Sequence, residues 1–125
     1  MNENEVSYLI RGAIFDVYKK LGPGLLESVY VNALDYELTK KELIVKREVP
    51  IPVFYEEIKM EVGFRLDLLV EEKVLIEVKS VENLAEVHHK QVLTYLKLTG
   101  LKLGVLVNFN VDQIGSGIFR KVNGL

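Results

Sequence analysis

The chain has 125 residues, a formal net charge of −2 and no cysteine. This length suits one compact core, so we expect a single domain over residues 1–125. Hydrophobic residues make up 49% of the chain and charged residues 27%, a balance that argues against disorder. The lack of cysteine excludes disulfides and thiolate metal sites, and no apolar run is long enough to span a bilayer. We therefore expect a cytoplasmic protein without a membrane partner.

Basic residues are concentrated toward the C-terminus. From Val87 to Leu125 the only acid is Asp112, beside five basic residues: Lys90, Lys97, Lys102, Arg120 and Lys121. Such a segment can form a basic patch on an otherwise acidic body, where a phosphate backbone could dock. A solvated surface with chance asymmetry has the same composition, so charge alone does not identify nucleic acid as the partner.

The first part of the chain predicts two helices. Apolar residues recur at every third or fourth position from Val6 to Leu21, and Asn4 is a candidate N-cap. The segment Gly22-Pro23-Gly24 ends this helix. A second helical pattern then runs from about Leu26 to Lys41.

The next segments predict strands. Ile44–Tyr55 is rich in β-branched residues but contains two prolines, which is typical of an edge or irregular strand. Lys59–Val70 and Val74–Val81 are predicted to form a hairpin, closed by the three residues Glu71–Lys73.

A third helix is predicted from about Leu84 to Leu98, ended by Gly100. The apolar run Leu103–Phe109 indicates a buried strand, and Ile118–Val122 indicates one further short strand. The order helix, helix, strand, strand, strand, helix, strand predicts an α/β domain with a mixed central sheet flanked by helices. The strands on either side of the third helix are expected to be parallel neighbours.

Alternation along the hairpin predicts that its charged side chains share one face of the two strands. The opposite face of the first hairpin strand is apolar and comprises Phe64, Leu66, Leu68 and Val70. The three-residue loop sets Asp67 opposite Glu77 and Arg65 opposite Lys79. Facing carboxylates repel each other, and a hard divalent cation relieves that repulsion. Lys79 could then orient the attacking water or stabilise transition-state charge, which is the arrangement of metal-assisted hydrolysis. The alternative is a salt-bridged sheet surface that faces solvent.

Two further groups could complete such a site. One stripe of the third helix carries three candidate substrate-binding residues, His88, Gln91 and Tyr95. Alternatively, Tyr95 belongs to the core and Gln91 is an exposed helix former. Glu27 lies in the first turn of the second helix, where a carboxylate also complements the helix dipole.

Taken together, these residues resemble the GxxExxY family, whose motif reads Gly24-Leu-Leu-Glu27-Ser-Val-Tyr30 in this chain. That family is assigned to the PD-(D/E)XK nuclease superfamily. The likeness extends to Ile76-Glu-Val-Lys79 and to the segment around Asp67, although Leu66 stands where the superfamily name has proline.

The resemblance implies a restriction-endonuclease-like fold and a set of site residues. Glu27, Asp67 and Glu77 would be metal ligands that converge on one ion, and Lys79 would be the catalytic lysine. The spacing Gln91 to Tyr95 matches the Q-x-x-x-Y motif of the RecB-like exonuclease branch.

We therefore expect a nuclease that depends on Mg²⁺ or Mn²⁺ and hydrolyses phosphodiester bonds in nucleic acid, DNA rather than RNA. Two other interpretations stay open. The chain could be a nucleic-acid or protein interaction module without catalysis, or a metal-dependent hydrolase with another substrate. The presence of all four polar residues, Glu27, Asp67, Glu77 and Lys79, favours the nuclease. No separate target-recognition segment is evident, so specificity would come from loops, a partner protein or a second subunit, which leaves room for a homodimer.

Overall fold

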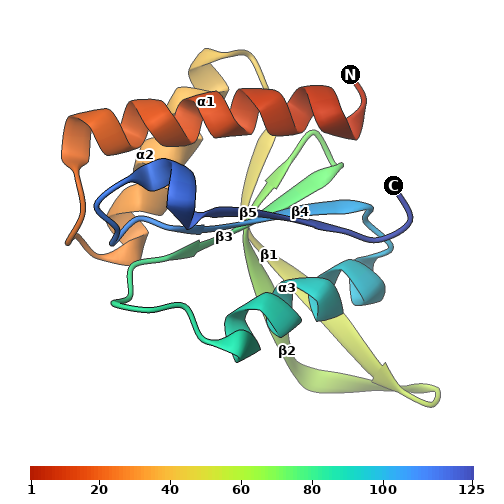
Figure 1. Ribbon diagram of the computed structural model, residues 1–125. Coiled ribbons are helices and arrows are strands. Elements are labelled where there is room, and N and C mark those ends of the chain that lie inside the picture. The colour runs from red at the N-terminus through yellow and green to blue at the C-terminus, as the bar shows by residue number, and fades with distance from the viewer.

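The computed structural model describes residues 1–60 and 63–125 with their side chains. Five strands form one mixed sheet in the order β1-β2-β3-β4-β5, with helices on both faces (Figure 1). In chain order the elements are α1 (Glu3–Leu21), α2 (Glu27–Lys40), β1 (Val45–Tyr55), β2 (Ile58–Val70), β3 (Val74–Lys79), α3 (Glu86–Thr99), β4 (Leu103–Asn108), the 3₁₀ helix η1 (Ile114–Gly117) and β5 (Ile118–Val122). The predicted α/β order is confirmed, including the short last strand.

The N-cap of α1 is Asn2, so the prediction of Asn4 was wrong. The Asn2 side chain accepts a hydrogen bond from the Glu5 backbone N–H at 2.8 Å, and the Glu5 carboxylate accepts one from the Asn2 N–H at 3.0 Å. This reciprocal capping box satisfies two amide groups that a helix start leaves unpaired. The Asn4 side chain instead accepts a hydrogen bond from Arg120 on β5.

The centre of the sheet is the parallel pair of β3 and β4, whose register runs from Val74–Leu103 to Lys79–Asn108. Almost every residue of both strands is buried because helices cover both faces, which explains their continuous apolar sequence. Gly104 lets α3 approach closely, since a Cβ there would lie 2.9 Å from the Val92 Cγ1 atom. The expected parallel pairing across α3 is confirmed.

The sheet divides the core into two layers. Helices α1 and α2 pack on one face, and α3 packs on the other (Figure 1). The α3-side layer comprises Ile51, Leu66, Leu69, Leu75, Val92, Tyr95, Leu96 and Leu106. Among the described residues, none of the helices has the length and apolar character needed to cross a bilayer.

Strand β2 does not alternate as predicted. Leu66 and Leu69 both pack in the α3-side layer, whereas Leu68 packs on the face covered by α1 and α2. The predicted common face for Leu66 and Leu68 was therefore wrong. The alternation fails where β2 separates from β3, because the ladder between them ends at the pair Leu68–Ile76.

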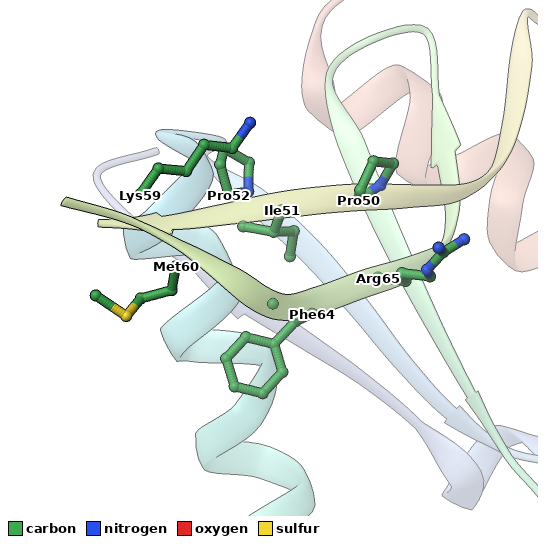
Figure 2. A pocket seen from close by; sticks show the side chains of 8 residues that line it. Pro50, Ile51, Pro52, Lys59, Met60, Phe64 and Arg65 are labelled. Carbon is green, nitrogen blue, oxygen red and sulfur yellow. The ribbon is translucent and has the colours of Figure 1, made fainter. Parts of the chain in front are cut away.

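Beyond that pair, β2 continues as a two-stranded ribbon with β1 that extends past α3 (Figure 1). Arg65 pairs with Pro50 across this ribbon and is not opposite Lys79, which corrects the predicted pairing. A hollow of ≈ 310 Å³ lies on the ribbon. Figure 2 shows that the Phe64 ring points toward α3 while the Arg65 side chain points away from it.

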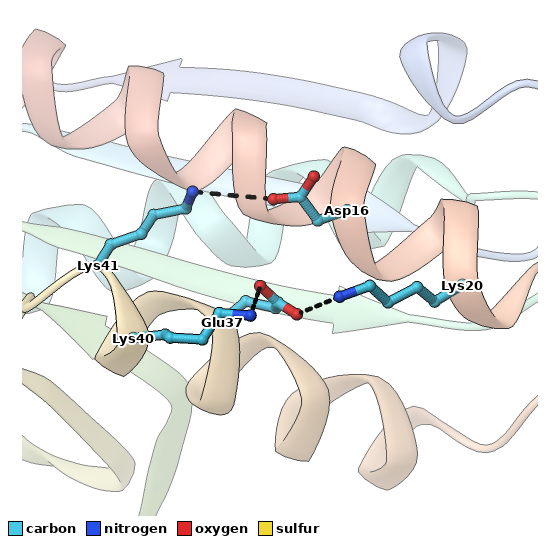
Figure 3. A network of polar contacts seen from close by, with 5 residues as sticks. All are labelled: Asp16, Lys20, Glu37, Lys40 and Lys41. Atoms are coloured by element: carbon cyan, nitrogen blue, oxygen red, sulfur yellow. Dashed lines mark hydrogen bonds and ion pairs between the residues drawn. The ribbon is translucent and has the colours of Figure 1, made fainter.

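Glu37 of α2 holds the two N-terminal helices together through a buried carboxylate. It contacts Lys20 Nζ of α1 at 3.0 Å and Lys40 Nζ at 3.3 Å (Figure 3). The side chain of Glu37 is 7% exposed, whereas both lysines are more than half exposed. The hydrogen bond from Lys20 is the main cause that lowers the pKa of Glu37 below its usual value.

We expect Glu37→Gln to lower the Tm by roughly 4 °C near neutral pH, because the ion pairs of half-exposed lysines are individually weak. The lowered pKa means that the stabilisation is present above the usual carboxyl pKa of 4.5 and is lost as the pH falls below it. Thermal unfolding at several pH values measures this. Asp16→Asn is the control, since Asp16 is half exposed and lies 3.8 Å from Lys41. An equal effect of both substitutions would contradict a special role for Glu37.

Candidate active site

Asp67 and Glu77 lie on β2 and β3, one residue beyond the last pair of their ladder. The predicted register is confirmed up to that pair, Leu68–Ile76. The backbone N–H of Asp67 donates to Glu77 Oε1 at 3.2 Å, and the N–H of Val78 donates to Asp67 Oδ2 at 2.8 Å. Each carboxylate thus accepts a hydrogen bond from the opposite strand, at the point where main-chain pairing stops.

This carboxylate pair is largely withdrawn from water. Glu77 is only 5% exposed. This burial, together with the negative charge of Asp67, raises the pKa of Glu77 to about 8. Burial also raises the pKa of Asp67, although the Val78 N–H opposes the shift. Among the described residues neither carboxylate forms an ion pair. The alternative of a salt-bridged, solvent-facing surface is therefore wrong for this pair.

Lys79 is the last residue of β3 and pairs with Asn108 of β4. Its backbone carbonyl accepts a hydrogen bond from the Phe109 N–H at 2.9 Å, which fixes the end of the strand. The side chain is half-buried. Burial raises the pKa of both Asp67 and Glu77, and the positive charge of Lys79 opposes that rise.

Glu27 begins α2 and reaches the same end of the sheet. Its Oε2 atom accepts a long hydrogen bond of 3.4 Å from the backbone N–H of Ser80, directly after β3. Its charge raises the pKa of both Asp67 and Glu77. However, no three acidic, histidine or cysteine side chains in the described part of the chain form a metal-binding cluster. The expected convergence of three carboxylates is therefore not found, because Glu27 and Asp67 are each turned toward a backbone amide.

The motif tyrosine, Tyr30, explains how the segment before Glu27 is held. Its buried hydroxyl donates to the Gly22 carbonyl at 2.6 Å and accepts from the Leu25 N–H at 3.1 Å. Its ring stacks on Phe109 with centroids 4.2 Å apart and an interplanar angle of 3°. One side chain thus fixes the start of α2 against the end of β4.

Tyr30→Phe is expected to destabilise the fold by about 1–2 kcal/mol, because the Leu25 N–H loses a partner while the ring stacking is kept. Urea denaturation measures the change in the free energy of unfolding, and hydrogen exchange should show faster exchange at Leu25. Tyr36→Phe is the matched control on the same helix, since Tyr36 is 66% exposed. We expect the control to change stability by less than about 0.5 kcal/mol. Equal effects of the two substitutions would contradict the clamping role.

Sequence reasoning missed two residues that position this end of the sheet. The Ser80 hydroxyl donates to the Leu25 carbonyl at 2.6 Å. Asn108 is 3% exposed, donates through Nδ2 to the Val81 carbonyl at 2.9 Å and accepts through Oδ1 from the Val81 N–H at 3.1 Å. Asn108 had a detectable signal, since it is the one polar residue in an apolar strand. No sequence signal pointed to Ser80 except its position directly after Lys79.

The three residues predicted on helix α3 have different surroundings in the structure. Tyr95 is 4% exposed, and burial, followed by the charges of Glu77 and Asp67, raises its pKa to about 12. Tyr95 is therefore a residue of the core layer between α3 and the sheet. The Nδ1 atom of His88 accepts a hydrogen bond from the Ala85 N–H at 2.9 Å, so His88 caps the helix start. Gln91 is half-buried.

A family model described as the PD-(D/E)XK nuclease superfamily matches residues 4–121. The chain belongs to this superfamily. Proteins of the superfamily are usually nucleases, and they generally use divalent metal ions such as Mg²⁺. No curated protein matches the chain.

A solved structure described as "Crystal structure of SSO0001" is also similar, with a TM-score of 0.57 and 22% sequence identity. The likeness covers 78% of this chain and 50% of that one, so this chain spans about half the length of that protein. At this identity the likeness concerns the fold, which is restriction-endonuclease-like as predicted.

The donor set at the end of β3 fits a hard divalent ion. Asp67 and Glu77 supply adjacent carboxylate oxygens, the ligand type that Mg²⁺ and Mn²⁺ prefer. The raised pKa of Glu77 reflects burial and a neighbouring negative charge that a cation would offset. The two residues therefore suit a metal centre of the kind that the superfamily uses.

Proposed function

We propose that the chain is a metal-dependent nuclease that hydrolyses phosphodiester bonds in nucleic acid, DNA rather than RNA, and that residues 1–125 are one nuclease domain. The observation that carries the proposal is the adjacent pair formed by the buried Glu77 and the half-buried Asp67, with the half-buried Lys79 on the same strand as Glu77. A buried carboxylate beside a second carboxylate destabilises a fold unless a cation compensates the pair, so the presence of this pair supports a functional role.

Asp67 and Glu77 would hold Mg²⁺ or Mn²⁺. When bound, such an ion polarises the scissile phosphate and makes water a better nucleophile. Lys79 would supply positive charge beside the reacting phosphate, either to orient the attacking water or to stabilise the transition state. Glu27 lies near enough to affect both carboxyl groups, and a turn of its side chain away from Ser80 would complete the ligand set.

We also propose that the chain belongs to the GxxExxY family within the superfamily. The motif tyrosine, Tyr30, has a structural role, because its hydroxyl bonds hold the segment before α2. The motif glutamate, Glu27, accepts a hydrogen bond at the end of β3. Among the three residues predicted on α3, Gln91 is the best candidate for substrate contact. It is neither fully buried like Tyr95 nor engaged as a helix cap like His88.

The test is a cleavage assay with purified protein on linear, circular and single-stranded DNA and on RNA, each with Mg²⁺, Mn²⁺ or chelator. Wild type should cut DNA only with metal, and Asp67→Asn should be inactive while it keeps the wild-type circular dichroism spectrum. Metal-dependent cleavage that survives Asp67→Asn would indicate a contaminating nuclease and reject the proposal. No cleavage of any substrate by wild type would reject it too and favour an interaction module.

A further inference from the structure

The outer face of α1 is exposed in the described chain. Tyr8 is 77% exposed and Phe15 is 42% exposed. Between them lies Gly12, where an added Cβ would meet no described atom within 4 Å apart from the adjacent residues and backbone of its own helix. Glycine inside a helix lowers stability relative to alanine. No contact within the described part of this chain accounts for a glycine at this position, whereas close approach of a partner surface would.

Five residues of α1 form a stripe that is complementary to itself when reversed. Glu5, Tyr8, Gly12, Phe15 and Lys19 follow one another at spacings of three or four, which places them on one side of the helix. Glu5 lies as far before Gly12 as Lys19 lies after it. Two antiparallel copies that cross at Gly12 would therefore set each acid opposite a lysine and each Tyr8 beside a Phe15.

The surface relief along this stripe fits such a crossing. A hollow of ≈ 460 Å³ lies beside Glu5 and Tyr8, one of ≈ 440 Å³ is lined by Gly12 and Phe15, and one of ≈ 590 Å³ lies beside Phe15 and Lys19. Aromatic ridges thus alternate with hollows along the helix. Ridges that enter the grooves of an equivalent helix are the usual basis of helix packing.

We propose that α1 is the interface of an isologous homodimer whose two-fold axis passes beside Gly12. The occupant is a second copy of this chain, because the stripe provides both members of each expected contact. Helix α1 covers the sheet face opposite α3, so this pairing leaves both carboxylate pairs accessible. One helix pair buries less surface than a standard interface, so we expect a dissociation constant on the order of micromolar.

Sedimentation velocity over a wide range of protein concentrations tests the proposal without reference to nuclease activity. Gly12→Leu should raise the dissociation constant at least about tenfold because the added side chain keeps the helices apart. Its Tm should not fall, since leucine favours the helix more than glycine does. Loss of the dimer in this variant can then not be attributed to unfolding.

Lys19→Glu should also weaken the dimer, because it places two acids opposite each other. Lys19 is the better member to change, since Glu5 also closes the capping box of α1. Lys97→Glu is the matched control, because Lys97 occupies the last turn of α3 as Lys19 does of α1. A wild-type chain that stays monomeric throughout, a dimer unaffected by Gly12→Leu and Lys19→Glu, or equal weakening by Lys97→Glu would each overturn the proposal.

Discussion

A Lys79→Met variant is expected to lose about 10²–10³-fold in kcat while it keeps the wild-type fold. Methionine retains an unbranched apolar side chain at the end of β3 and removes only the charge. Among the described residues Lys79 forms no ion pair, so no salt bridge is lost. Single-turnover cleavage of DNA at saturating Mg²⁺, with the Tm measured in parallel, checks this expectation.

The matched control is Lys102→Met. Lys102 is exposed and directly precedes Leu103, which pairs with Val74 at the opposite end of β3 from Lys79. It should retain wild-type kcat. A Lys79→Met variant within about tenfold of wild type would remove this lysine from transition-state stabilisation. A similar loss in both variants would instead indicate a general electrostatic effect of basic residues on substrate binding.

The facing acids could be predicted from the sequence because a local feature fixes them. The three-residue loop Glu71–Lys73 pairs Val70 with Val74, and this pair sets the register of everything further along the hairpin. Turn length is readable in a single sequence, so Asp67 and Glu77 could be brought together before any tertiary contact was known.

The geometry beyond the ladder could not be predicted, because it depends on packing between distant segments. Leu66 packs in the layer beside α3, whereas Leu68 packs on the opposite face of the sheet. The direction of the Leu66 side chain depends on the separation of β2 from β3 and on the position of α3. Alternation predicts side-chain direction only within a regular strand. Arg65 was consequently assigned to the wrong neighbour.

Tyr95 illustrates a related limit. The sequence offered a core residue and a site residue as alternatives. The structure confirms the core residue, since Tyr95 is buried with its ring centroid 5.2 Å from that of Phe64, and the role in substrate binding stays a prediction. The cap of α1 is different, since the spacing of Asn2 and Glu5 carried the capping-box signal. That feature was local and could have been found.

Glu77→Gln is expected to stabilise the metal-free protein by about 2 kcal/mol near pH 8, because it removes a buried negative charge beside Asp67 without changing side-chain shape. The glutamine oxygen can still accept the hydrogen bond of the Asp67 N–H. The pKa of Glu77 is about 8 in the fold against 4.5 as its usual value. The folded state therefore binds the extra proton between these values, and wild-type stability should fall as the pH rises through that window.

Thermal unfolding in chelator, at mildly acidic pH and near pH 8, measures this difference, which should vanish toward the acidic end. Millimolar Mg²⁺ or Mn²⁺ should then raise the Tm of wild type, because an ion that binds only the folded state stabilises it, and should raise that of Glu77→Gln much less. Glu57→Gln is the control, since Glu57 is exposed in the turn between β1 and β2 and should change neither quantity. A Glu77→Gln variant less stable than wild type near pH 8 in chelator would mean that the carboxylate serves the fold itself. Equal metal stabilisation of both proteins would place the ion elsewhere.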